Sequence, residues 1–211
     1  MNNFFYKVND KEYEVEVIYK RIKNIHYRFK DGKFVICCNR YVSKATIMNG
    51  LEKYGANLIK RSSRESGLGD DYIYLFGDKY QIVYPGILRL DGYPEIKYKT
   101  QEELLKKLKP IFLNIVAERV RYYEKMMKLP SYKVSIRNMT TRFGSNSRSS
   151  KHLTFAFMLI HVSTPLLDSV IVHELAHIKV FNHSKAFYDV VYKYYPNYDE
   201  CHTKLRKGEF K

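Results

Sequence analysis

The chain has 211 residues, of which 45% are hydrophobic and 15% aromatic, and its formal net charge is +15. This length suffices for one domain or two small ones, and the composition is that of a globular protein, not of a disordered one. Its apolar runs are much shorter than the roughly 20 residues that a membrane-spanning helix needs, so we expect no membrane partner. Residues 1–9 lack a basic segment followed by an apolar one, so no secretory leader is expected.

Three cysteines, Cys37, Cys38 and Cys201, form no CxxC pair and leave an odd number. A disulfide framework is therefore not indicated. Reduced thiols are typical of the cytoplasm, and we expect a cytoplasmic protein.

The positive charge has two interpretations. A basic protein gains affinity for phosphates, so nucleic acid or another polyanion is a possible partner. Alternatively, the lysines and arginines are scattered over solvated faces, since no single arginine-rich stripe stands out in the sequence.

Residues 1–100 are predicted to form a β-rich N-terminal region. Residues 12–19 alternate as a strand, and Asp31-Gly32 predicts a hairpin between residues 25–29 and 33–37. Ser43 is expected to cap a helix that ends near residue 59. Three further features complete this region: a polar, flexible joint at 62–71, strands within 72–84, and a turn at Gly77-Asp78.

Residues 101–211 are predicted to form the catalytic region. Apolar spacing predicts a helix over 101–127, with a kink or break at Pro110. Two strands, 132–143 and 153–159, are expected to be joined by a polar stretch at 144–151. Two helices should follow: one opened by Ser163, Thr164 and Pro165 and ending near Val180, and one over 184–195 that stops before Pro196.

The motif that indicates chemistry is His173-Glu174-Leu175-Ala176-His177. Residues i and i+4 share one face of a helix, so both imidazoles can bind one ion. Glu174 can accept a proton from zinc-bound water, whose pKa the metal lowers toward about 7. The alternative is a surface helix with solvated histidines, but the apolar neighbours indicate burial, and unpaired buried polar groups cost several kcal/mol. We therefore predict a Zn²⁺ site.

A catalytic zinc site needs a third protein ligand and a position left open for water. His183 is the best candidate, because Asn182-His183-Ser184 has the composition of a turn that could return toward the ion. A helix-capping histidine is the alternative interpretation. The rival ligands are Asp189, Asp199, Glu200 and His202.

With these motifs the sequence resembles the YgjP-like metallopeptidases, relatives of the SprT and WLM zincins. The resemblance rests on the HExxH motif, followed by Asn182-His183-Ser184 and Phe187, and it extends over about residues 15–205. Upstream, similar elements are Arg142-Phe143-Gly144-Ser145-Asn146-Ser147, Leu153-Thr154-Phe155, Leu167-Asp168, Lys30-Asp31-Gly32-Lys33, Val42-Ser43-Lys44 and Leu75-Phe76-Gly77.

Two positions depart from the family pattern. Phe143 stands where the family has tryptophan, which keeps a large apolar ring, and Asn146 stands where it has cysteine, which removes any role for a thiolate. The resemblance implies an α+β fold in which a short sheet packs on the HExxH helix, as in zincins. The alternative to two regions is one continuous family domain over about residues 15–205.

Four further residues are candidates for supporting roles. Arg142 and Asn146 are expected on or beside a hairpin near the metal helix, where they could polarise a substrate or simply stabilise the turn. Tyr188 could donate to an oxyanion, or pack in the core. Asp168 could accept a hydrogen bond from a ligating imidazole, or favour the positive end of its helix.

The resulting hypothesis is a zinc-dependent metallopeptidase. His173, His177 and His183 hold the metal, Glu174 is the general base, and the partner is a peptide or protein that could add to the edge of the 153–159 strand. Three alternatives stay open, and the first two are hydrolysis of nucleotides or other phosphate substrates and a nucleic-acid-associated protease of the SprT type. A further one is a nucleic-acid-associated module whose zinc is only structural.

Overall fold

The computed structural model describes residues 3–62 and 66–211, and the chain divides into two compact units, Met1–Glu65 and Ser66–Lys211. Residues 66–100, which we expected to belong with the N-terminal region, belong to the second unit instead. The reason is that Ile73, Leu75 and Tyr98 share a hydrophobic core with the helix that follows. Part of the expected joint, residues 63–65, lies outside the described residues.

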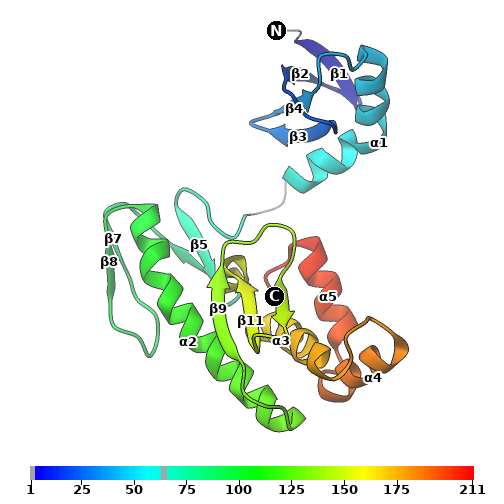
Figure 1. Cartoon of the computed structure of the whole chain (residues 1–211). Helices are drawn as coiled ribbons and strands as arrows, with labels where there is room; N and C mark the ends of the chain where they lie inside the picture. The colour runs from blue at the N-terminus through cyan, green and yellow to red at the C-terminus, as the bar shows by residue number, and fades with distance from the viewer. Residues whose placement is uncertain (1–2, 63–65) are drawn as a thin grey trace. The chain divides into compact units, whose positions relative to one another are not determined.

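The first unit is a four-stranded sheet with one helix (Figure 1). The predicted strand at 12–19 and the predicted hairpin are confirmed: Asp31 and Gly32 form the turn with φ of 52° and 78°. The sheet order is β1-β2-β4-β3, and the central pair β2 and β4 is parallel. Its elements are β1 (Phe4–Val8), β2 (Lys11–Tyr19), β3 (His26–Lys30), β4 (Lys33–Cys38) and α1 (Lys44–Ser62).

Ser43 caps α1 as predicted, because its Oγ accepts a hydrogen bond from the backbone N–H of Thr46 at 3.1 Å. Alternate residues of β2 and β4 are buried: Val15, Val17, Phe34 and Ile36 form the centre of this unit's core.

The second unit begins with two short hairpins and a long helix. Thr100 caps the helix by accepting from the N–H of Glu103 at 3.2 Å. Of the kink or break that we expected at Pro110, the break is excluded, because the helix continues through the proline. Leu108 and Phe112, both fully buried on either side of the proline, hold the segment in place. The elements are β5 (Tyr72–Leu75), β6 (Asp78–Gln81), β7 (Gly86–Leu88), β8 (Ile96–Tyr98) and α2 (Gln101–Met127).

A three-stranded sheet follows, and three expectations about it are wrong. The polar stretch expected to join two strands contains a strand of its own, β10 (Gly144–Ser147). Along the chain it follows β9 (Lys133–Arg137) and precedes β11 (His152–Ala156). The order is β10-β11-β9, so β11 is central and does not offer the free edge that we expected for a peptide. Residues after Ala156 form a short 3₁₀ helix, Phe157–His161, instead of extending the strand.

Three helices complete the unit: α3 (Thr164–Lys179), α4 (Lys185–Tyr194) and α5 (Tyr198–Lys207). The first two confirm the sequence prediction, whereas α5 was not expected. α3 carries the HExxH motif and is called the motif helix below. It contacts α2, α4, α5 and β10, so it lies at the centre of the unit (Figure 1).

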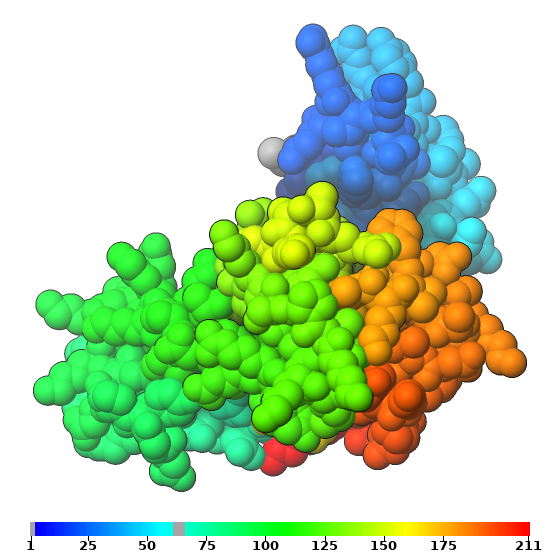
Figure 2. All heavy atoms as spheres, turned by 60° about the horizontal axis from the view of Figure 1, so that its bottom comes forward, coloured from blue at the N-terminus to red at the C-terminus, as the bar shows by residue number. Residues whose placement is uncertain are grey.

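Figure 2 shows one face of this unit, on which yellow-green atoms of the β9–β11 region lie between the green atoms around α2 and the orange atoms around α3 and α4. The fold class is α+β, with a short sheet packed on the motif helix as predicted. None of the helices in the described residues has the length and apolarity to cross a membrane.

Candidate active site

Three imidazoles meet at the end of the motif helix. His173 and His177 lie one turn apart on α3, and His183 lies in the connection to α4. One ring nitrogen from each lies within 4.8 Å of the other two, and Nε2 of His183 is 3.1 Å from Nε2 of His173. The chain therefore brings together the three residues that the sequence predicted as ligands.

The surroundings of these rings fit a metal ion. Burial, with a smaller effect of the neighbouring imidazoles, lowers the pKa of His173 to about 3, and burial also lowers the pKa of His177. Both rings are thus neutral at pH 7, which is the form that ligates metals. Nδ1 of His177 is buried without a well-aligned hydrogen-bond partner in the described part of the chain, although the backbone of Val180 and Phe181 interacts with this ring and opposes the lowering of its pKa.

Phe187 of α4 supports the cluster from one side. Its ring centroid lies 4.9, 4.5 and 4.8 Å from those of His173, His177 and His183, and its side chain is fully buried. An apolar wall of this kind restricts the rings to a narrow range of orientations.

The rival ligands have other contacts. Asp199 accepts from the hydroxyl of Tyr192, and Glu200 pairs with Lys204. His202 stacks on Tyr198 with centroids 5.5 Å apart. Asp189, the remaining rival, likewise does not belong to the cluster of ligand atoms that the described residues form.

Glu174 is 6% exposed and points toward β10. Burial raises the pKa of its carboxyl to about 7, against the opposing effect of the Arg142 charge. Gly144 makes room for this side chain: a Cβ at position 144 would lie 2.5 Å from Oε1 and 2.6 Å from Cγ of Glu174. The glycine is needed here for close approach, not for an unusual backbone angle.

Asn146 connects β10 to the motif helix. Its Nδ2 donates to the backbone carbonyl of Glu174 at 2.7 Å, so the side chain does more than stabilise its own turn. Its Oδ1 is buried and has no partner among the residues described. The amide therefore presents an acceptor beside the site.

These residues line a cavity of about 600 Å³. Arg142 lies in its lining, as the sequence predicted, together with Arg148 and Arg206, which the sequence analysis did not single out. Apart from Glu174, the lining contains no carboxylate. The cavity lining combines one buried carboxyl, three arginines and four imidazoles, those of the three clustered histidines and of His202.

Tyr198, the first residue of α5, is a residue of the site that the sequence analysis missed. Its Oη lies 2.8 Å from Nδ1 of His173, and the two rings stack with centroids 5.8 Å apart. Tyrosine is the commonest aromatic residue of this chain, so no local signal set Tyr198 apart.

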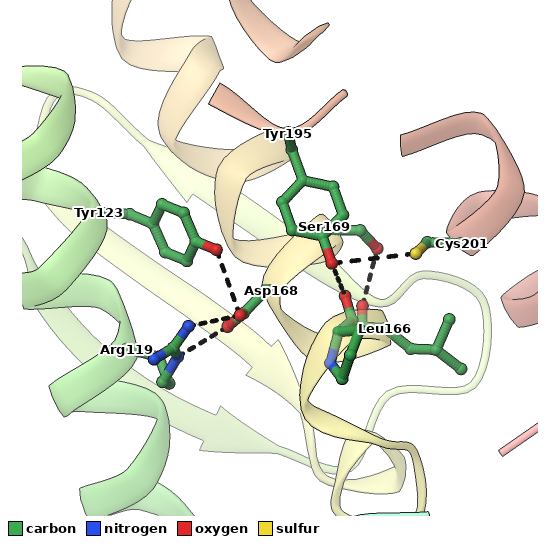
Figure 3. A network of polar contacts seen from close by, with 8 residues as sticks. Arg119, Tyr123, Leu166, Asp168, Ser169, Tyr195 and Cys201 are labelled. Carbon is green, nitrogen blue, oxygen red and sulfur yellow. Dashed lines mark hydrogen bonds and ion pairs between the residues drawn. The ribbon is translucent and has the colours of Figure 1, made fainter. Parts of the chain in front are cut away.

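Asp168 does not bond to an imidazole, contrary to one of our expectations. Its carboxylate accepts from Nε of Arg119 at 2.8 Å and from the hydroxyl of Tyr123 at 3.2 Å, as Figure 3 shows. Both partners come from α2. Asp168 therefore anchors α3 to the neighbouring helix, and burial together with this carboxylate raises the pKa of Tyr123 to about 12.

Tyr188 is not part of the cavity lining. Its ring stacks on Tyr192 with centroids 6.0 Å apart and contacts Phe187, which is a packing role. The structure gives no support to the oxyanion role that we had considered.

Comparison with known proteins now adds to this geometry. The model of the family described as YgjP-like, metallopeptidase domain, matches residues 23–208. The chain belongs to this family. Membership identifies the YgjP-like chain as a metallopeptidase, and therefore as a hydrolase.

Among solved structures, the chain is similar to the metallopeptidase zymogens abylysin from Pyrococcus abyssi and jannalysin from Methanocaldococcus jannaschii. The identities are 20% and 23%, and the TM-scores 0.42 and 0.41. Each match covers 44% of this chain, and 93% and 95% of the respective neighbour. No curated protein matches the chain.

Proposed function

We propose that the protein is a zinc peptidase whose metal is held by His173, His177 and His183. The observation that carries this proposal is the convergence of three ring nitrogens within 4.8 Å of one another. The buried carboxyl of Glu174 lies next to His173 on α3. All-nitrogen sites of three histidines suit zinc. When bound, zinc supplies a Lewis acid that acidifies water and polarises a carbonyl group.

Glu174 acts as the general base in this proposal. Burial raises the pKa of its carboxyl, which strengthens the carboxylate as a proton acceptor, and it can return the proton later in the reaction. The carboxylate takes the proton of the attacking water and delivers it to the nitrogen of the leaving amine. Arg142 keeps part of the Glu174 population ionised by its positive charge.

The substrate in this proposal is a peptide or protein segment in extended form. β10 is an outer strand of its sheet, and Gly144, Ser145 and Asn146 of this strand line the cavity. An edge strand can pair with an extended chain through backbone hydrogen bonds. This role falls to β10 and not to the 153–159 segment that we first considered.

The test is Glu174→Gln, which keeps the size of the side chain and removes its basicity. Peptide hydrolysis should fall by about two to four orders of magnitude, while zinc content stays near one per chain. Glu118→Gln on the exposed face of α2 is the control, and its activity should equal wild type. Full turnover in a zinc-loaded Glu174→Gln protein contradicts the proposed role of the base.

A second candidate function is the hydrolysis of nucleotides or other phosphate substrates at the same site. Arg142, Arg148 and Arg206 in the cavity lining favour it, because guanidinium groups bind phosphate oxygens. Release of phosphate or pyrophosphate from nucleoside triphosphates, with no cleavage of peptides, would decide for this alternative.

For the location we propose the cytoplasm, and this rests on the three reduced cysteines.

A further inference from the structure

A second cavity lies in the first unit, at the end of its two central strands. β2 and β4 are parallel and paired with Tyr19 opposite Cys38, so the chain leaves both strands at the same edge of the sheet. The backbone N–H of Lys20 donates to the carbonyl of Cys38 at 2.8 Å and so links the segments that follow the two strands. Residues 19–21 and 39–41 line a cavity of about 340 Å³ at this edge.

Crevices outside the carboxyl ends of parallel strands are recurrent ligand sites in open sheets. Here the segments that follow β2 and β4 place three cationic side chains in the lining of one cavity: Lys20, Arg21 and Arg40. The cavity lining contains no acidic residue, and in residues 3–62 and 66–211 no carboxylate lies within ion-pair distance of these three side chains. Their charge is therefore available to an anion from outside.

Two tyrosine rings accompany the cations. Tyr41 is 82% exposed and Tyr19 46% exposed, so both rings are accessible to a ligand. The guanidinium of Arg40 lies over the Tyr41 ring at 5.3 Å. The side chain of Asn39 restrains the segment that follows β4, because its Oδ1 accepts a hydrogen bond from the backbone N–H of Tyr41 at 3.2 Å.

We propose that this cavity binds single-stranded nucleic acid. Phosphates take the three cations, and unpaired bases stack on the exposed rings of Tyr19 and Tyr41. This combination of a basic groove and aromatic platforms is how proteins hold single strands without reading their sequence. A polyphosphate or a phosphopeptide would use the cations but leave the tyrosine rings without a function. The inference does not depend on the metal site.

The test measures the affinity of the full-length protein for fluorescein-labelled oligouridylate and oligothymidylate by anisotropy at several salt concentrations. For the wild type, the logarithm of the association constant should fall linearly with the logarithm of the salt concentration. The slope should be about −2, because about three phosphates are neutralised. Tyr41→Ala should weaken binding about tenfold. Arg21→Gln should weaken binding and make the slope shallower by about 0.7.

Matched controls come from the same unit. Phe5→Ala removes an aromatic ring that is 65% exposed, and Arg28→Gln removes an exposed cation of β3; both should keep wild-type affinity at the labelled strand. Inorganic polyphosphate is the second probe, and its affinity should not change in Tyr41→Ala. Peptide hydrolysis should equal wild type in every one of these variants.

Three results overturn the proposal. The first is no binding of either oligonucleotide at low salt, and the second is an equal loss of affinity in Phe5→Ala and Tyr41→Ala. The third is an equal loss for polyphosphate and oligonucleotide in Tyr41→Ala, which would assign the cavity to polyanions in general.

Discussion

The phenol oxygen of Tyr198 lies 2.8 Å from Nδ1 of His173, so the last helix of the chain contacts a predicted metal ligand directly. When Nε2 of His173 keeps its lone pair for a metal, Nδ1 carries the proton and donates a hydrogen bond to the phenol oxygen of Tyr198. A partner of this kind fixes both the tautomer and the ring orientation of a ligating histidine. Tyr198 is 4% exposed, so water does not easily replace it.

Tyr198→Phe should therefore weaken zinc binding by about 10- to 100-fold, because the ring stays and only the hydrogen bond to His173 is lost. Competition with a zinc-binding dye measures the affinity. Tyr192→Phe is the control: its hydroxyl bonds to exposed Asp199, and its loss should leave zinc affinity unchanged. Equal affinity in Tyr198→Phe and wild type would show that the contact does not orient the ligand.

His183→Ala should reduce zinc affinity by more than about 100-fold, a larger loss than removal of a ligand's hydrogen-bond partner produces. His202→Ala and Glu200→Ala should have much smaller effects, because these side chains lie outside the ligand cluster. Zinc content after dialysis against a chelator distinguishes the variants. If Glu200→Ala loses the metal and His183→Ala retains it, the third ligand is a carboxylate and the assignment of His183 is wrong.

Arg119→Ala should destabilise the second unit by about 3 kcal/mol, since it leaves the carboxylate of Asp168 buried without its cation. Chemical denaturation followed by circular dichroism measures the change. Arg121→Ala, an exposed arginine on the same helix, is the control and should change stability by less than about 0.5 kcal/mol. Similar stabilities of the two variants would contradict an anchoring role.

The stability of the protein should depend on His161 below about pH 6.5. Burial lowers the pKa of this imidazole, whose Nδ1 lies 2.7 Å from the carbonyl of Tyr74. The unfolded chain therefore binds the proton more readily, so the contribution of His161 is complete above its unfolded pKa and is lost as the pH falls toward the folded value. Over this window wild type should lose up to about 1.4 kcal/mol per pH unit more than His161→Asn. Parallel pH profiles of the two proteins would refute this.

The sequence predicted those parts of the site that depend on local order. The spacing of His173 and His177 defines one face of a helix, and the turn residues around His183 direct the chain back to it. Asp31-Gly32 predicted its hairpin for the same reason, because the turn conformation depends on these two residues alone.

The parts that sequence analysis missed depend on contacts between distant residues. Tyr198 meets His173 across 25 positions, and Arg119 meets Asp168 across 49. β10 has the sequence Gly-Ser-Asn-Ser and shows no apolar alternation, so only its pairing with β11 and its contact with Glu174 make it a strand. Neither periodicity nor turn chemistry carries such information.

The close approach of Gly144 to Glu174 has a mechanical consequence. Two points of β10 bear on the same glutamate: its side chain fills the space that a Cβ of residue 144 would occupy, and the amide of Asn146 donates to its backbone carbonyl. We therefore expect a displacement of the outer strand to displace the carboxyl of Glu174 as well. In the proposed reaction, a peptide that pairs with β10 would therefore act on the position of this carboxyl, and we expect Gly144→Ala to lower activity while leaving the three clustered histidines unchanged.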